Sequence, residues 1–324
     1  MKKDILALLR QSSGEYLSGE ELSRRLGVSR TAVWKHIQSL REAGYQIDSQ
    51  PRRGHCLLAV PDKLYPEEIS AGWNAGKLGQ SVCYFAEVVS TNEEARRLAE
   101  KGAEEGTVVL ADSQTGGKGR MGRHWHSPAG KGILISIILR PAIQPSRAPH
   151  LTMVAAVAAA NAIEKVSGLK PGIKWPNDIL VNGKKVCGIL TELKAETERI
   201  HYGIVGIGLN VNLSIEDLLP DLYTTATSLA IERGQPFSRV LLTQSLLAHM
   251  EAFYFSYLNQ GFNPIKDAWK KMNVTLGRPV QVKAPEGQFS GIALDIDDNG
   301  ALLVAGEVGI KSFYAGDVTL RAEG

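Results

Sequence analysis

The stretch that decides the central part of this chain is residues 107–139, which read TVVLADSQTGGKGRMGRHWHSPAGKGILISIIL. Its two ends, Thr107–Ala111 and Ile133–Leu139, are apolar and rich in β-branched residues, which predicts two buried strands. Residues Asp112–Lys131 between them have no hydrophobic period, and they include five glycines and the cations Lys118, Arg120, Arg123 and Lys131. Glycines let backbone N–H groups approach a ligand, and cations attract an anion. The segment therefore predicts a mobile lid over a phosphate-bearing ligand, with a solvated hairpin tip as the alternative.

Two familiar phosphate-binding motifs do not account for this loop. Gly117, Gly119 and Gly122 have the spacing G-x-G-x-x-G, but no helix follows them, so the dinucleotide-binding fold is excluded. Lys118 is followed by glycine rather than by Ser or Thr, which excludes a P-loop. The loop must belong to another kind of site.

Composition indicates an ordinary globular protein with an uneven charge distribution. The chain has 324 residues, 44% apolar and 22% charged, enough for two or three domains. The net charge of +3 is too small to imply nucleic acid by itself. Between Arg24 and His55, however, seven Lys or Arg face two acidic residues, whereas from Leu276 onward four basic residues face seven acidic ones. This asymmetry predicts different partners for the two ends.

Cysteine usage and hydropathy predict a cytoplasmic protein without membrane attachment. Cys56, Cys83 and Cys187 form no C-x-x-C pair, which is typical of reduced thiols. No apolar run is long enough to span a bilayer, and the first residues do not resemble a signal peptide.

The first 65 residues predict a winged helix–turn–helix. Helical periodicity at 3–10 is followed by a capping box, Ser18-Gly-Glu-Glu21, and by a third helix, Arg30–Ala43, with Ser29 as its N-cap. Two short strands flank Pro51-Arg-Arg-Gly54 and would form the wing. We expect DNA to be bound by Ser29, Arg30, Thr31, Trp34, Lys35 and Gln38 of the third helix and by Arg52 and Arg53 of the wing. A protein-interaction module of the same shape is the alternative.

The rest of the chain predicts an α+β organisation. Residues 66–272 alternate strands and helices, including strands Gly172–Trp175, Lys184–Leu193 and Ile200–Asn210 and an Ala-rich helix, Leu151–Val166. This order favours a mixed sheet with helices on one face. Residues 273–324 contain several short alternating strands, which predict a small C-terminal β-barrel.

Four motifs in the central domain carry polar side chains at strand ends. They are Ser90-Thr91-Asn92, Gln114 with its loop, Lys174-Trp-Pro-Asn177-Asp178, and Gly183-Lys-Lys185-Val-Cys-Gly188, and Asn210 ends a further strand. Simple helix capping and an Asx turn are the alternatives for the first and third. Since alternate strand residues face opposite sides, one of the two adjacent lysines must point inward, where it needs an anionic partner.

These motifs together resemble the biotin–protein ligases, and the N-terminal module resembles their bifunctional members, which also repress biotin synthesis genes. The resemblance covers essentially the whole chain. It implies a class II synthetase-like ligase domain and an SH3-like C-terminal barrel, with ATP, biotin and Mg²⁺ as ligands. It implies a biotin carboxyl carrier protein as acceptor of biotin on a lysine, operator DNA as a partner, and a homodimer formed on adenylate binding.

The resemblance also implies residue roles. Biotin would be bound by Ser90, Thr91, Asn92, Gln114, Lys118, Gly119, Arg120 and Lys185. The nucleotide would be bound by Arg123, Trp125, Asn177 and Asn210, with Asn210 near Mg²⁺. Lys185, Arg120 and Asp178 would be catalytic. Some relatives carry Arg in place of Lys118, which keeps the charge but has a bidentate fork that lysine lacks.

Two other functions remain open from the residues. The same scaffold serves lipoyl and other acyl ligases, although Gln114 and the Ser-Thr-Asn cluster favour a polar ring over an alkyl chain. A regulator that binds ligand without catalysis is the second alternative, which the presence of Lys185, Arg120 and the Asn-Asp pair disfavours.

Overall fold

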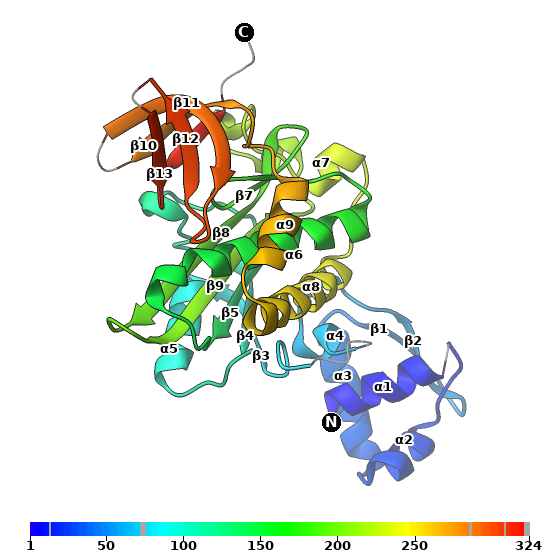
Figure 1. Ribbon diagram of the computed structural model, residues 1–324. Helices are drawn as coiled ribbons and strands as arrows, with labels where there is room; N and C mark the ends of the chain where they lie inside the picture. Colours follow the sequence, from blue (N-terminus) through cyan, green and yellow to red (C-terminus); the bar gives the residue numbers. More distant parts are fainter. Residues whose placement is uncertain (13, 72–75, 285–286, 308, 321–324) are drawn as a thin grey trace. The chain divides into compact units, whose positions relative to one another are not determined.

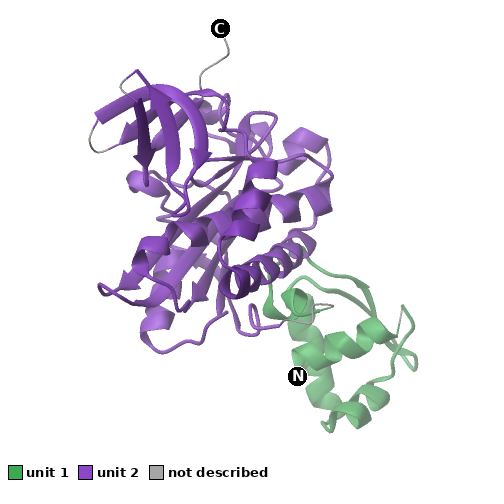
Figure 2. Ribbon diagram, in the orientation of Figure 1, with its two compact units in different colours: residues 1–72 green, residues 73–324 purple. Residues whose placement is uncertain are grey.

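The computed structural model describes residues 1–324 apart from 13, 72–75, 285–286, 308 and 321–324. The chain forms two compact units, Met1–Gly72 and Trp73–Gly324 (Figure 2). The last four residues of the expected C-terminal domain lie outside the described residues. In the part that is described, no helix combines the length and the apolar character needed to cross a bilayer.

Unit 1 is a winged helix–turn–helix, as the sequence predicts. Ser18 and Ser29 accept hydrogen bonds from Glu21 N (3.0 Å) and Ala32 N (3.2 Å), so both act as helix N-caps. Gly27 ends the second helix in the left-handed conformation. The elements are α1 (Lys2–Gln11), α2 (Gly19–Leu26), α3 (Arg30–Glu42), the antiparallel pair β1 (Gln46–Gln50) and β2 (Gly54–Ala59), and α4 (Pro66–Ile69). The core is formed by Ile5, Leu6, Leu9, Leu22, Val33, Ile37 and Leu40.

Unit 2 is built on a seven-stranded mixed sheet with the order β3-β4-β5-β9-β8-β7-β6 (Figure 1). Only β3 and β4 pair in parallel among these described strands. The bounds are β3 (Val82–Val88), β4 (Val108–Gln114), β5 (Gly132–Leu139), β6 (Gly172–Lys174), β7 (Asp178–Val181), β8 (Lys184–Ala195) and β9 (Ile200–Asn210). The two strands predicted on either side of the glycine-rich loop are β4 and β5, and every residue of β5 is buried.

Helices cover both faces of this sheet, so the expectation of helices on one face is wrong. Ile204 of β9 packs with Ala95 and Ala99 of α5 (Thr91–Glu100). A methyl group on the adjacent Gly203 would instead meet Leu151 of α6. Neighbouring strand residues face opposite sides, so α5 and α6 lie on opposite faces. The remaining helices are α6 (Pro149–Ser167), α7 (Leu229–Arg233), α8 (Arg239–Gln260) and α9 (Asn263–Met272).

The C-terminal segment forms a separate five-stranded antiparallel sheet, in agreement with the predicted small β domain. Its order is β13-β12-β11-β10-β14. The bounds are β10 (Pro279–Ala284), β11 (Gly287–Ile296), β12 (Leu302–Gly306), β13 (Gly309–Phe313) and β14 (Asp317–Leu320). The β11–β12 turn is joined to the larger sheet, because Trp175 Nε1 donates a hydrogen bond to Gly300 O at 3.1 Å.

His150 fastens the same turn to the helical layer. Its Nε2 lies 3.0 Å from Asp298 O, and its Nδ1 lies 3.0 Å from the Tyr257 hydroxyl. The imidazole stacks on Phe262, with 3.8 Å between ring centroids. Burial lowers the pKa of His150 from 6.5 to about 4, so the side chain is neutral in the folded protein at neutral pH.

We predict that acidification destabilises the protein through His150. Between pH 6.5 and about 4 the unfolded chain binds a proton at this side chain that the folded chain does not bind. The free energy of unfolding should therefore fall as the pH falls through this window. His150→Gln cannot titrate, so the gap in melting temperature between wild type and variant should narrow on acidification. A gap that stays constant or widens would show that His150 is charged in the folded state.

Candidate active site

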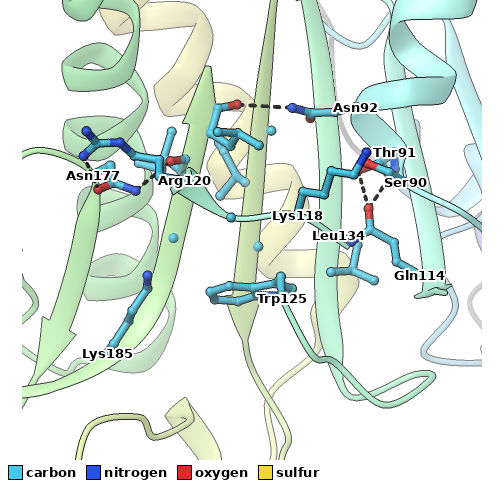
Figure 3. Close-up of a pocket in the computed structure, with 17 residues that line it drawn as sticks. Ser90, Thr91, Asn92, Gln114, Lys118, Arg120, Trp125, Leu134, Asn177 and Lys185 are labelled. Carbon is cyan, nitrogen blue, oxygen red and sulfur yellow. Dashed lines mark hydrogen bonds between the residues drawn. The ribbon is translucent and has the colours of Figure 1, made fainter. Parts of the chain in front are cut away.

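The floor of the candidate site is bare backbone on β8 and β9. Gly208 pairs with Gly188, and Gly206 lies two residues earlier on the same face. A methyl group on Gly206 would come within 2.1 Å of Asn92 Oδ1, and one on Gly208 within 2.5 Å of the Trp125 ring. Any larger residue would fill the space above the sheet. The pocket that the glycines leave above the sheet spans about 480 Å³, part of which is open to solvent (Figure 3).

One end of this pocket is polar, where α5 begins and β4 ends. Gln114 Oε1 accepts hydrogen bonds from Thr91 N (2.7 Å) and from the Thr91 hydroxyl (3.0 Å). Ser90, Thr91 and Asn92 are all buried in the pocket wall. Ser90 stands at the N-cap position of α5, but its side chain makes no capping hydrogen bond. The capping alternative therefore does not explain why Ser90 is there.

Asn92 is held by residues that the sequence analysis did not single out. Its Nδ2 donates to Glu192 Oε2 at 2.7 Å, and its Oδ1 lies 2.6 Å from the Ser136 hydroxyl. Glu192 also pairs with Arg96 at 2.7 Å. Ser136 and Glu192 belong to β5 and β8, and only the pairing of these strands with β9 brings them to the start of α5.

The glycine-rich loop crosses the pocket and forms its outer wall (Figure 3). The Lys118 ammonium group lies 2.6 Å from Glu93 Oε1 and is 60% exposed, so this side chain is at the mouth, while Gly119 lines the pocket with backbone. Trp125 packs over Gly208, and its buried Nε1 has no hydrogen-bond partner among the described residues. A buried donor in this position is available to a ligand.

Arg120 lies inside the loop and turns towards the sheet. Its Nη1 donates to Asn177 Oδ1 at 3.1 Å and to Gly316 O at 3.4 Å. Burial lowers the pKa of Arg120, and nearby Asp317 and Asp178 oppose that effect. A guanidinium stays charged at neutral pH because its ordinary pKa lies far above neutrality.

Lys185 supplies a second cation to the same wall. Its Nζ lies 2.6 Å from Asp178 Oδ1 and 5.5 Å from the centroid of the Trp125 ring. The neighbouring Lys184 points elsewhere and donates to Tyr223 O at 3.0 Å. Of the two adjacent lysines, the inward one is therefore Lys185, and its anionic partner is Asp178.

A wider cavity adjoins the first and spans about 1690 Å³, part of which is open to solvent. The wall between them contains Gly119, Arg120, Trp125, Asn177 and Lys185, which line both. Every residue expected to bind the small ligand lines the first cavity. Those expected to bind a nucleotide line the second, together with Asp178. The structure thus brings all the expected ligand-binding residues of unit 2 into two joined cavities.

Asn210 is the residue expected near a metal ion. Its Nδ2 donates to Thr227 O at 3.0 Å, whereas its buried Oδ1 accepts no hydrogen bond from the described residues. Within those residues there is also no cluster of three or more His, Cys, Asp or Glu side chains that could hold a metal. A single unpaired protein oxygen is enough for an Mg²⁺ ion whose other ligands are phosphate oxygens and water.

Two charged residues that line the wider cavity, Lys174 and Asp317, were not among the site residues expected from the sequence. Lys174 is part of the Lys-Trp-Pro-Asn-Asp motif but was given no role, although it pairs with Asp178 across the β6–β7 hairpin. Burial lowers the pKa of Lys174, and Asp178 opposes that shift. Asp317 of β14 forms an ion pair with Arg123. No local pattern could have signalled Asp317, because it belongs to the other sheet.

The expected DNA-binding residues lie on α3 and the wing of unit 1. Arg30, Thr31, Trp34 and Arg52 line one groove. Trp34 is 56% exposed despite its size, which is unusual for a tryptophan without a partner. Arg53 is held outside this groove, over the Tyr16 ring at 4.2 Å. Ser29 acts as N-cap, while Lys35 is exposed and Gln38 partly buried on α3.

Comparison with known proteins identifies the fold. Residues 84–210 match the family model of the biotin/lipoate A/B protein ligase family, residues 2–55 match an HTH domain, and residues 275–321 match the biotin protein ligase C-terminal domain. The structure is similar to the biotin protein ligase from Aquifex aeolicus in complex with biotin and ATP. The TM-score is 0.65 at 29% identity, covering 75% of this chain and 100% of that one.

Two relatives match the chain over nearly its whole length. The bifunctional ligase/repressor BirA of Bacillus subtilis (strain 168) is 43% identical over 320 residues, covering 99% of this chain and 98% of the relative. The protein of the same description from Escherichia coli (strain K12) is 31% identical, covering 98% and 96%. The chain belongs to the family of bifunctional biotin–protein ligases and repressors.

Proposed function

We propose that this protein activates biotin with ATP, as biotinyl-5′-AMP, and transfers the biotinyl group to a lysine of a biotin carboxyl carrier protein. We propose further that it represses biotin synthesis genes, with the adenylate as corepressor. The observation that carries the ligase function is the cationic wall between two joined cavities, formed by Lys185 and Arg120. A small anion on one side and a nucleotide on the other would meet at that wall.

The narrower pocket suits the ring of biotin. Ser90, Thr91 and Gln114 offer hydrogen-bonding groups to a ureido ring at the polar end, and Asn92 is braced beside them by Glu192. The flat glycine floor admits a fused ring and a chain that leads to Lys185. We assign the outer wall to Lys118, Gly119 and Trp125, with Lys118 acting mainly through its backbone, since its side chain is paired with Glu93.

The first chemical step needs cancellation of charge more than proton transfer. The carboxylate of biotin is already ionised, and its oxygen attacks the α-phosphorus while the bond to the β-phosphate oxygen breaks and pyrophosphate leaves. Two anions must approach each other, so positioned cations are the chief requirement. Lys185 and Arg120 meet that requirement, and Asn177 orients Arg120 through a 3.1 Å hydrogen bond. Arg123 and Asn210 would contact the nucleotide.

The donor set admits Mg²⁺ beside Asn210. The free Oδ1 of Asn210 would hold the ion, together with oxygens of the nucleotide. When bound, Mg²⁺ would neutralise phosphate charge.

The second step requires a neutral amine. The acceptor lysine attacks the acyl carbon, the carbon–oxygen bond to phosphate breaks, AMP leaves and the amine loses a proton. Asp178 lies at the wall beside Lys185, where it would orient the amine or accept its proton. The loop that contains Gly119 and Trp125 would keep water from the mixed anhydride until the amine arrives.

DNA binding is assigned to α3 and the wing. Helix α3 would enter the major groove, with Arg52 and Arg53 at the backbone or the minor groove. We propose that the adenylate orders a surface for homodimer formation, so that two such helices reach two half-sites.

We also propose that the protein acts in the cytoplasm and that its domains are residues 1–65, 66–272 and 273–324. One family-model match falls inside each of the three.

We predict that Lys185→Met lowers the rate of biotin-dependent ATP–pyrophosphate exchange by about 10²–10³-fold, because an electrostatic contact to the reacting phosphate is lost. Lys184→Met is the matched control and should stay near wild type, since Lys184 contacts Tyr223 instead. Equal losses in both variants would contradict the assignment. Lipoate in place of biotin should support no exchange, and exchange with lipoate alone would favour the acyl-ligase alternative.

We predict that Gly206→Ala weakens biotin binding by about tenfold or more, because the new methyl group must displace Asn92. Gly203→Ala is the control on the same strand, with its methyl group directed towards Leu151 on the opposite face. Isothermal titration with biotin measures both. Unchanged affinity in Gly206→Ala, or an equal loss in Gly203→Ala, would place biotin elsewhere.

We predict that biotinyl-5′-AMP tightens self-association and operator binding together, because a ligand that favours the dimer also favours the complex of that dimer with DNA. Sedimentation with and without adenylate measures the first, and operator titration at fixed salt measures the second. A chain without the residues before Pro61 should lose operator binding and keep exchange activity. The same dimerisation constant with and without adenylate would refute the linkage.

A further inference from the structure

One buried arginine ties together the two strand ends from which the glycine-rich loop emerges. Arg239 is the first residue of α8 and is 1% exposed. Its Nη1 donates to Asp112 Oδ1 and to Gly132 O, each at 3.1 Å. Asp112 lies near the end of β4, and Gly132 is the first residue of β5. A single guanidinium therefore spans both ends of the loop 115–131.

This contact lies on the face of the sheet away from the ligand pocket. Ala111 pairs with Leu134, which lines the pocket, so the next residue, Asp112, faces the other way. Asp112 is 3% exposed, and its Oδ2 accepts a hydrogen bond from the Tyr84 hydroxyl at 2.7 Å. Neither Asp112 nor Arg239 lines either cavity of the site.

The returning end of the loop is fixed at the same point. The amide of Gly130 donates to the carbonyl oxygen of Asp112 at 3.3 Å. A methyl group on Gly130 would come within 3.9 Å of Arg239 Nη2. Both ends of the loop therefore lie beside one buried ion pair. The middle of the loop contains Gly119, Arg120 and Trp125, which line both cavities.

Stability alone does not account for this pair. Two charges lose their hydration when they are buried, and apolar residues of similar size often serve the fold equally well. A guanidinium nitrogen that donates to two acceptors differs from apolar packing in being directional, because its hydrogen bonds fix the distance between the groups that it joins. Here it fixes the separation of the two strand ends, and hence the height of the loop over Lys185 on β8.

We propose that Arg239 and Asp112 are positioning residues that clamp the base of the loop and set how long the acyl-adenylate stays beneath it. They act without touching the ligand. This inference rests on the proposed ligase function, since the adenylate is the species retained.

The experiment uses the full chain with the double substitution Arg239→Met and Asp112→Leu, which removes both charges and keeps apolar volume. The melting temperature should stay within a few degrees of wild type. Biotinyl-5′-AMP should dissociate at least about tenfold faster, because a misplaced loop no longer seals the site. Trypsin should cleave faster at Lys118, Arg120 and Arg123, with or without ligand.

Tyr257→Phe is the matched control. It removes a buried hydrogen bond, to His150, from the same helix α8 but far along the helix from its first residue. It should leave adenylate dissociation and loop cleavage at their wild-type rates. Wild-type rates in the double variant would overturn the inference. So would an equal acceleration in Tyr257→Phe, because general loosening of α8 would then suffice.

If the double variant does not fold, Arg239→Lys decides on the same readouts, because lysine keeps the charge but lacks the planar guanidinium. Its expected effect is smaller but has the same sign, and wild-type rates would overturn the clamp. Failure of the wild type to form adenylate would count against the proposed function instead. In that case, the ligand-free cleavage rates of the loop would still test the clamp.

Discussion

The structure depends on two positive charges held in the wall between two cavities. Lys185 reaches that wall from β8 and is balanced by Asp178 at 2.6 Å, while Arg120 reaches it from the loop and is oriented by Asn177. Both side chains lose hydration there, so each needs fixed partners nearby. The bare glycines of β8 and β9 leave room for a ligand beneath them. Cations held in this way can lower the barrier for two anions that must meet, because little reorganisation is needed at the moment of reaction.

Much of this arrangement could be predicted from the sequence, because its signals are local. Capping residues predicted where the second and third helices of unit 1 begin, and Ser18 and Ser29 do cap these helices. Strand alternation required one inward lysine at 184–185. The hairpin of β7 and β8 was missed, although Asn182 and Gly183 form its two-residue turn with φ of 50° and 78°. Asn-Gly is a strong hairpin signal, but the four-residue β7 was too short to register as a strand.

What the sequence could not provide are contacts between distant segments. Ser136 and Glu192 support Asn92 only because three strands pair in one register. Asp317 meets Arg123 from the C-terminal sheet, and Arg239 meets Asp112 from a helix that begins far along the chain. The same limit explains the wrong expectation for the sheet. The periodicity of α5 shows that it has a buried face, and the apolar residues all round α6 show that this helix is buried, but neither pattern shows which side of the sheet the helix covers.

The central claim is that an acyl-adenylate forms at the cationic wall and is kept there by the loop. Native mass spectrometry of the intact chain, after incubation with biotin and Mg-ATP and removal of free ligand, tests it most directly. We expect one biotinyl-5′-AMP per chain, and we expect its biotinyl group to be transferred when a carrier protein with an acceptor lysine is added. A chain that carries no added mass, or one that carries only intact ATP and biotin, would contradict it.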